Sequence, residues 1–463
     1  MWREESRALI LHGTPAIEES VVFDFGVIPG RCILLNVRNG KWYSRHGSLS
    51  GLINVIPLAV EKLATGSLPP FTSPSRPLIL GLFSLLLSVA VAALLFSVTG
   101  FYVESLPVRA AFVLLSIYTT YLWNYLRGCG SETYQLLAYL FFYISFLRFK
   151  RRPEPFAERP RADLYWAWLA LAALCQIRFT YLALGPLLAA AIAYDAWRAG
   201  VAREHRDDLL ARLIVVPGVL VLLAQGAVHF WKFGSPFLSG YHQWWEPPVP
   251  HTVWTVLYDF LVSAQYGFFI CFPLLVLALF GWRRFFSNHR DEAALLLASA
   301  LAILCILAPL PFWRGGWAYG PRYFVFILPL LALPALYPLE WAFVKLREPR
   351  RAAALFTVVV FGLFSAFAQL QIHRLPYFTK YVIYESLGTV RSPAVSAYFE
   401  TTALPKINWD HLHKRWEELP YFAELKGEIP PERLAKWQKR TEALLATSNL
   451  FFFPKINVLG KKE

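Results

Sequence analysis

Charged residues are scarce in this chain: Asp, Glu, Lys and Arg make up 16% of its 463 residues, whereas hydrophobic residues make up 56%. A soluble domain carries about 25% charged residues. The deficit goes with long apolar runs such as residues 77–99, which contain no charge. A run of that length can cross a hydrocarbon core of about 30 Å, so the sequence indicates an integral membrane protein.

Metal-binding and redox cysteine motifs are also missing. The five cysteines include no Cys-x-x-Cys pair, and Cys175, Cys271 and Cys305 lie in apolar runs. This pattern argues against a structural zinc site. It predicts free thiols, with a disulfide between Cys32 and Cys129 as the alternative.

Nucleotide-binding motifs are absent as well. The sequence has no P-loop and no G-x-G-x-x-G, so we expect no nucleotide cofactor. It also has no N-x-Ser/Thr sequon. We also expect no secretory signal peptide, because no short apolar segment follows the polar start. The formal net charge is +14, but Lys and Arg lie in short loops beside apolar segments and not in one patch. That distribution is typical of membrane proteins and argues against nucleic acid as a partner.

Apolar runs recur along most of the chain and predict an all-α polytopic membrane protein with about ten transmembrane helices. The predicted segments are approximately 77–99, 107–126, 131–148, 164–178, 181–196, 211–230, 265–282, 293–311, 323–343 and 352–372. The fourth and fifth segments are short and meet at Arg178, which indicates a broken or partly re-entrant pair. Residues 49–62 have an amphipathic pattern that predicts a segment lying at the membrane surface.

Basic residues are divided unequally between alternate loops. The rich loops contain Arg148, Lys150, Arg151, Arg152, Arg159, Arg161, Arg198, Arg203, Arg206, Arg212, Arg283, Arg284, Arg290, Lys345, Arg347, Arg350 and Arg351. The opposite short loops contain only Arg127, Arg178, Lys232, Arg314 and Arg322. The rich loops are therefore predicted to be cytoplasmic.

This orientation divides the chain into three parts. We expect an outer first loop over 1–76, a transmembrane domain over 77–372, and a small, mostly helical outer domain over 373–463. The loops around 229–262 and 312–322 also face outward. The prediction is a multi-pass protein of the cell (inner or plasma) membrane with its C-terminus outside.

The first outer loop is itself rich in Arg and Lys. A basic segment is exported more easily behind a preceding helix, so we expect an eleventh helix upstream of Met1. Met1 is the only methionine of the chain, which makes a misplaced start plausible.

Two acids near the start, Glu4 and Glu5, are candidates for a general base, and Tyr43 and His46 follow in the same loop. A carboxylate near a membrane surface can act as a base when desolvation raises its pKa. The alternative is a solvated charged tail.

Glu132 and Arg178 are charges at the ends of apolar segments, where charge is costly. Ser131 is expected to be the N-cap of its helix, and Glu132 in the first turn suits the helix dipole, so a purely structural role is the alternative there. An arginine at a helix end usually snorkels to the interface. On the outer side, however, Arg178 could hold an anionic headgroup.

A loop rich in glycine and aromatic residues precedes the ninth segment. Its rings Trp317 and Tyr319 are suited to stacking on sugars, and Arg322 can bind a phosphate through two N–H groups. The loop from Lys232 to His242 has a similar make-up with lower specificity.

Several short motifs share their order and sidedness with a known superfamily. They are Ser6-Arg7 with His12-Gly13-Thr14, Tyr43-Ser44-x-His46-Gly47, Trp123-x-Tyr125 with Ser131-Glu132, Arg178 followed by Pro186, Phe233-Gly234-Ser235-Pro236 with Gly240-Tyr241, and Gly316-Trp317 with Tyr319-Gly320-Pro321-Arg322-Tyr323. Over nearly all of residues 1–345 the chain thus resembles the GT-C superfamily of membrane glycosyltransferases. It is similar in particular to bacterial relatives of the dolichyl-phosphate-mannose protein mannosyltransferases and the aminoarabinose transferases. No single motif is diagnostic.

The resemblance implies inverting transfer of a sugar from a polyprenyl-phosphate carrier to a lipid, glycan or protein acceptor at the outer face. It implies a general base at Glu5 or Glu4 and a second acid at Glu132. The acids act alone or with a divalent metal ion, and Glu5 and Glu132 are the candidate ligands of that ion. The residues expected to bind substrate are Arg322, Arg178, Trp317, Tyr319, His242, Lys232, Tyr43 and His46.

Two alternatives remain. A transporter or flippase of lipid-linked saccharides would also be polytopic and basic, with charges deep within helices and a repeat between halves. A catalytically inactive GT-C relative that acts as an assembly partner is the other alternative, because the family's first helix is missing from the chain as it stands.

Overall fold

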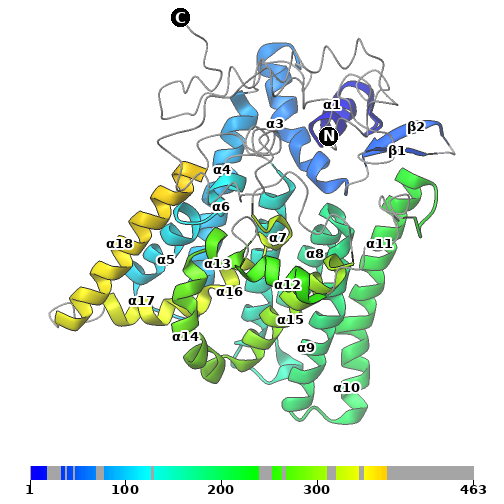
Figure 1. Ribbon diagram of the computed structural model, residues 1–463. Helices are drawn as coiled ribbons and strands as arrows, with labels where there is room; N and C mark the ends of the chain where they lie inside the picture. Colours follow the sequence, from blue (N-terminus) through cyan, green and yellow to red (C-terminus); the bar gives the residue numbers. More distant parts are fainter. Residues whose placement is uncertain are drawn as a thin grey trace, which may run out of the picture.

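The computed structural model describes residues 2–17, 33–36, 39–44, 47–68, 78–126, 130–238, 253–262, 267–309, 320–343 and 349–372. Within these residues the protein is mostly helical, with one two-stranded antiparallel hairpin (Figure 1). This agrees with the predicted helical class, although the hairpin was not predicted. The predicted outer domain over 373–463 lies outside the described residues.

The described residues form the following elements in chain order. They are α1 (Trp2–His12), β1 (Ile33–Asn36), β2 (Lys41–Ser44), α3 (Leu49–Thr65), α4 (Leu78–Thr99), α5 (Leu106–Tyr118), α6 (Leu122–Leu126), α7 (Ser131–Lys150), η1 (Phe156–Glu158), α8 (Arg161–Ile177), η2 (Phe179–Ala183), α9 (Leu184–Arg198), α10 (Arg203–Leu210), η3 (Ala211–Val215), α11 (Val216–Phe233), α12 (Val253–Val262), α13 (Phe268–Cys271), α14 (Leu274–Asn288), α15 (Arg290–Leu307), η5 (Arg322–Phe324), α16 (Leu328–Leu331), η6 (Leu333–Ala335), α17 (Leu336–Phe343) and α18 (Pro349–Ile372).

Three stretches of the described chain form helices long and apolar enough to cross a membrane: Leu78–Thr99, Phe179–Arg198 and Arg206–Phe233. Helix α4 alone has 22 residues. At about 1.5 Å per residue this length matches a hydrocarbon core of about 30 Å. The other predicted segments are helical wholly or in part. Their number as membrane spans remains a prediction.

Three segments that were each predicted as one helix are interrupted. Segment 265–282 divides into α13 and α14 at Phe272 and Pro273. Segment 107–126 breaks between α5 and α6, where the Tyr121 N–H donates to the carbonyl of Cys271 at 2.8 Å and not to its own helix. Segment 323–343 divides into η5, α16, η6 and α17. Prolines lack the N–H that an α-helix needs, and this segment contains Pro329, Pro334 and Pro338.

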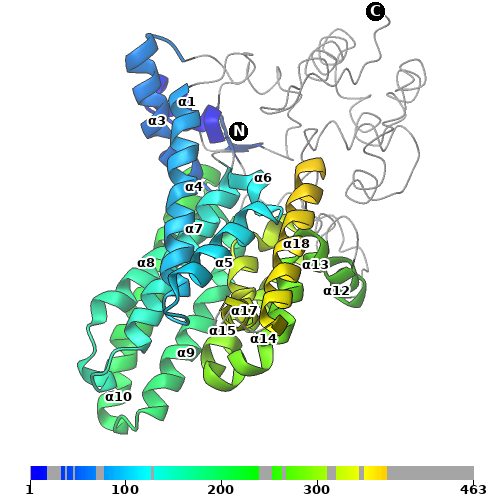
Figure 2. The same ribbon diagram turned by 90° about the vertical axis from the view of Figure 1, so that its left-hand side faces the viewer.

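The helices form a bundle with two distinct ends. Figures 1 and 2 show α1, α3 and α6 at the upper end and α10 at the lower end. Helix α7 is buried on nearly all sides and packs against α4 and α8, so it is the centre of the bundle. In the predicted orientation the upper end is the outer one.

Candidate functional site

Glu5 and Lys232 form an ion pair between α1 and the last turn of α11. The Lys232 ammonium donates to Oε1 of Glu5 at 2.8 Å, and both side chains are 1% exposed. Burial raises the pKa of the Glu5 carboxyl above its usual value, although Lys232 opposes the shift. The alternative of a solvated tail is therefore wrong for Glu5. The fold joins two predicted site residues that lie 227 positions apart.

The elements around this pair fix α1 on the bundle. Ser6 donates to the carbonyl of Gly51 in α3 at 2.6 Å. Tyr43 is buried in β2, accepts a hydrogen bond from Asn39 at 3.0 Å, and has its ring centre 6.4 Å from that of Trp231, the neighbour of Lys232. The predicted site residue Tyr43 thus lies beside α11, next to the ion pair.

A second group of charges lies at the start of α7. Arg322 donates through Nε to Oε1 of Glu132, and Nη2 of Arg178 lies 3.7 Å from the same oxygen. The guanidinium of Arg178 also lies over the ring of Tyr323, 4.4 Å from its centre. We call Glu5, Lys232, Glu132, Arg178 and Arg322 the upper cluster.

The structure corrects two structural alternatives for this group. Helix α7 begins at Ser131, and Gly130 occupies the N-cap position, so the prediction of Ser131 as N-cap is wrong by one residue. Arg178 does not snorkel to an interface, because it is 5% exposed and paired with Glu132. Its backbone is extended, with φ −152° and ψ 116°, and forms the sharp joint between α8 and η2.

Some polar atoms of the upper cluster have no hydrogen-bond partner within the described residues. They include Nη1 of Arg178 and Oε2 of Glu5, both buried. A buried polar atom left without a partner costs about 1–3 kcal/mol. Such atoms in a native fold require an explanation, and a bound ligand with complementary oxygen or hydroxyl groups is one.

A buried polar chain that was not predicted from the sequence lies between the helices that carry the two halves of the cluster. Gln176 donates to Oε1 of Gln225 at 3.0 Å, and Nε2 of Gln225 lies 2.7 Å from Nε2 of His229. This chain joins the end of α8, beside Arg178, to the helix that carries Lys232. The signal was present in the sequence: Gln225, His229 and Lys232 follow at helical spacing on one face of an apolar helix, and all three are buried.

Two glycines of the predicted motifs permit close approaches near the cluster. A Cβ on Gly47 would lie 1.8 Å from the carbonyl oxygen of Gln176, so the first loop packs directly on the turn before Arg178. Gly320 has φ +67°, and a Cβ there would lie 2.8 Å from the ring of Tyr121. Only glycine fits either position without movement.

The remaining predicted site residues are less well defined. Glu4 lies in α1, but its side chain is not described. His46, His242, Trp317 and Tyr319 lie outside the described residues. Their roles stay predictions.

The described residues do not fit a divalent metal ion. Among them there is no group of three or more His, Cys, Asp or Glu that could hold one. Glu5 faces Lys232, and Glu132 faces Arg322 and Arg178, so each candidate ligand already has a cation beside it.

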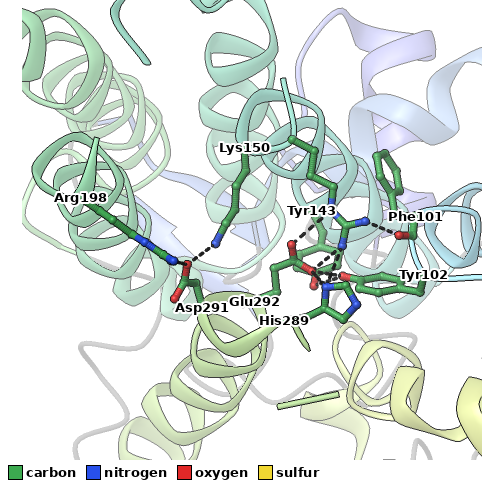
Figure 3. A network of polar contacts seen from close by, with 9 residues as sticks. Phe101, Tyr102, Tyr143, Lys150, Arg198, His289, Asp291 and Glu292 are labelled. Atoms are coloured by element: carbon green, nitrogen blue, oxygen red, sulfur yellow. Dashed lines mark hydrogen bonds and ion pairs between the residues drawn. The ribbon is translucent and has the colours of Figure 1, made fainter. Parts of the chain in front are cut away.

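The lower end carries a separate group, the lower network, shown in Figure 3. Its members are Tyr102, Tyr143, Lys150, Arg151, Arg198, His289, Asp291 and Glu292. Nη2 of Arg151 lies 2.8 Å from Oε2 of Glu292, and its Nε lies 3.3 Å from Oε1. Tyr102 donates to the same carboxylate at 2.8 Å.

The other half of the lower network centres on Asp291. Its Oδ2 accepts from Lys150 at 2.9 Å and from Arg198 at 3.2 Å. Burial alone would raise the pKa of Asp291, but the Lys150 ammonium outweighs it and lowers the pKa below its usual value. The sequence predicts these basic residues in cytoplasmic loops but does not predict their acidic partners.

Within the residues that the structure describes, the fold and the site together define a mostly helical protein with three helices able to cross a membrane and a buried, partly paired charge cluster at one end. No protein-family model matches the chain, and no curated protein matches its sequence. The resemblance to the GT-C superfamily therefore rests on the motifs alone.

Proposed function

We propose that the protein is a polytopic glycosyltransferase that moves a sugar from a polyprenyl-phosphate carrier to a hydroxyl or amine acceptor, with inversion, at the outer face of the cell membrane. One observation carries the proposal. Arg178 and Arg322 are both held on Glu132 at one end of the helices, and Nη1 of Arg178 is buried without a partner among the described residues. Guanidinium N–H groups form strong hydrogen bonds with phosphate oxygens.

The two arginines would stabilise the leaving group. When the bond between the sugar C1 and the phosphate oxygen breaks, its electron pair stays on the phosphate, which gains negative charge. Arg178 can donate to a phosphate oxygen through Nη1, and Arg322 adds a second positive charge nearby. Glu132 acts as a positioning residue that orients both guanidinium groups. Donors fixed in place before the reaction favour the transition state because they need no reorganisation.

Glu5 would act as the general base. As the acceptor oxygen or nitrogen attacks C1 from the face opposite the phosphate, it must lose a proton. Oε2 of Glu5 can accept that proton while Oε1 stays on Lys232. The raised pKa of Glu5 brings it closer to neutral pH, where a base is more effective.

The membrane explains the position of the cluster. A polyprenyl chain lies among the lipids, so its phosphate reaches the end of a helical bundle by lateral diffusion. The three apolar helices provide the surroundings for such a carrier. A nucleotide site is not needed, because the carrier itself activates the sugar.

The test is transfer of radiolabelled sugar from polyprenyl phosphate in proteoliposomes, with native membrane extract as the acceptor source. Arg178→Gln and Arg322→Gln should each lower turnover by about 10²–10³, the loss usual for one oxyanion-stabilising donor. Arg198→Gln is the matched control, because Arg198 belongs to the lower network and its side chain is 66% exposed. Wild-type turnover in both upper variants would contradict the proposal. Movement of the donor across the bilayer without transfer would favour the flippase.

A further inference from the structure

We infer that α3 is a half-inserted helix whose apolar face contacts the acyl chains of the outer half of the bilayer. The sequence predicts a segment lying on the membrane surface, whereas the contacts of α3 indicate a steep path beside α4. Lipid acyl chains would contact this face of α3 whether or not the protein transfers sugar.

The apolar face of α3 is exposed along its whole length. Leu52, Ile56, Val60 and Leu63 follow at helical spacing, and Ile56 and Leu63 are 65% and 87% exposed. The opposite face is buried and contains Gly51, Asn54, Leu58 and Glu61. An exposed apolar stripe of this length on an otherwise packed helix indicates a hydrophobic partner.

The C-terminal part of α3 is fixed at the start of α4. Glu61 accepts hydrogen bonds from the backbone N–H groups of Leu78 at 3.3 Å and Ile79 at 2.6 Å. A carboxylate at this position satisfies the unpaired N–H groups of the first turn and suits the helix dipole. Glu61 and Leu78 therefore lie at the same level of the bundle.

The N-terminal part of α3 lies beside other helices. Asn54 accepts from the hydroxyl of Tyr134 in α7 at 2.6 Å. Just before the helix, Gly47 packs on the carbonyl of Gln176 at the end of α8. Helix α3 thus runs alongside α4, towards the levels at which α7 begins and α8 ends, as Figures 1 and 2 also show.

The start of α7 and the end of α8 lie well below the start of α4. Thr133 in the first turn of α7 donates to the carbonyl of Tyr125 in α6 at 2.9 Å, and Arg178 after α8 pairs with Glu132, so all three helix ends lie at about the same level. The hydroxyls of Ser84 and Ser88 both donate to the carbonyl of Leu126, at 3.3 and 2.7 Å, so the end of α6 lies beside the second and third turns of α4. At 1.5 Å per residue this is roughly 9–15 Å below Leu78.

The level of the bilayer follows from α4. Its exposed apolar face begins with Leu78, 70% exposed, and continues through Leu82 and Leu86. The helix needs nearly its whole length to cross the hydrocarbon core, so the core extends up to the level of Leu78. The N-terminal half of α3, which is its lower half, must then lie within the hydrocarbon core. The apolar stripe of α3 then lies beside that of α4.

The experiment measures depth with nitroxide spin labels on the protein in liposomes. Single cysteines replace Leu52, Leu63, Leu86 or Lys41 in a background without the five native cysteines, and collision with oxygen is compared with collision with a water-soluble nickel chelate. The label at Leu52 should favour oxygen nearly as strongly as the α4 reference at Leu86, and the label at Leu63 should be shallower. Lys41, exposed in the hairpin, should favour nickel.

Two results would overturn the inference. Equal depths at Leu52 and Leu63 would show a helix that lies flat on the surface. Protection of Leu52 from both reagents would show that protein covers the stripe, for example residues 373–463. If the cysteine-free protein does not fold, benzoylphenylalanine at Leu52 and Leu63 of the native-cysteine protein gives the same answer. Photo-crosslinks to lipid at Leu52 are expected, and crosslinks only within the protein contradict the inference.

Discussion

The upper cluster and the lower network both bury charged side chains, but they satisfy them differently. In the lower network both carboxylate oxygens of Glu292 are paired, and Asp291 accepts from two cations. In the upper cluster Nη1 of Arg178 and Oε2 of Glu5 have no partner among the described residues. At the lower end Oδ2 of Asp195, which interacts with Lys150, also has no hydrogen-bond partner among the described residues. Paired buried charges can stabilise a fold, whereas unpaired buried atoms are costly unless a ligand uses them. We therefore propose that the lower network mainly stabilises the fold and that the upper cluster binds the donor.

Helix α7 makes this comparison direct, because it carries a member of each group. Glu132 lies in its first turn and Lys150 in its last. Substitutions at its two ends can be compared within one element. Substitutions at the Glu132 end should mainly affect turnover, and substitutions at the Lys150 end should mainly affect stability.

The largest expected effect is on turnover at Glu5. Glu5→Gln keeps the size of the side chain and removes the proton acceptor, so turnover per folded molecule should fall by about 10²–10⁴. The change also breaks the buried pair with Lys232, so the amount of folded protein is measured on the same samples. If Glu5 is the base, its ionised form is the active one, and because burial raises its pKa, wild-type turnover should still rise with pH above 4.5, the ordinary value. This rise should be absent in the variant. The measurement is a pH profile of sugar transfer, with exposed Glu158→Gln as the control.

If Glu5→Gln retains wild-type turnover and the same pH profile, the base assignment is wrong. A Glu4→Gln variant then tests the other predicted acid. A loss of turnover in Glu4→Gln alone would move the base by one residue and leave the anion site in place.

At the lower end the largest effect should be on folding. Arg151→Gln leaves the buried carboxylate of Glu292 without its main cation, so the free energy of unfolding should fall by about 3–5 kcal/mol. Turnover per folded molecule should not change. Arg152→Gln is the matched control, since Arg152 has a 43% exposed side chain and a single partner, Asp163. It should cost less than about 1 kcal/mol.

Unfolding of the purified protein in detergent by denaturant measures both variants, with transfer activity followed on the same samples. Equal losses of unfolding free energy in Arg151→Gln and Arg152→Gln would show that the lower network does not contribute the stability that its pairing indicates. A fall in turnover at unchanged stability would remove the distinction between the two ends.

A smaller effect is expected at Glu132. If Glu132 only stabilises the start of α7, Glu132→Gln should lower the free energy of unfolding by about 1 kcal/mol and leave the rate of sugar transfer unchanged. As the residue that orients Arg178 and Arg322, it should also lower turnover and raise the KM for the donor. The split between KM and kcat separates the two roles. A variant with lower stability but wild-type kinetics would support the purely structural alternative.

Much of the helical architecture could be predicted, because long apolar runs are local signals. The breaks could be predicted only in part. Three prolines mark the divided segment 323–343, but the break at Tyr121 depends on a hydrogen bond to Cys271, 150 residues away, which no local pattern contains. The hairpin is four residues per strand and is too short to be distinguished from a loop.

The site could be predicted as separate residues but not as pairs. Glu5, Lys232, Glu132, Arg178 and Arg322 stood out because charge near apolar segments is costly. Sequence separations of 190 and 227 residues hide which acid meets which cation.

The lower network could not be predicted from local patterns either. Asp291 and Glu292 each lie 141 residues from the cations Lys150 and Arg151 that they meet in the fold. The buried polar face of α11 that carries Gln225 and His229 was also not predicted, although the helical spacing of these residues is present in the sequence.

Binding of polyprenyl phosphate without its sugar tests the central claim most directly. Affinity is measured for the wild-type protein, Arg178→Gln and Arg151→Gln in nanodiscs, at a temperature where all three are folded. A charge-assisted hydrogen bond contributes about 1.5–3 kcal/mol, so Arg178→Gln should weaken binding by roughly 10- to 150-fold. Arg151→Gln should bind as the wild type does. Equal affinities for all three proteins, or an equal loss in both variants, would contradict the assignment of binding to the upper cluster and stability to the lower network.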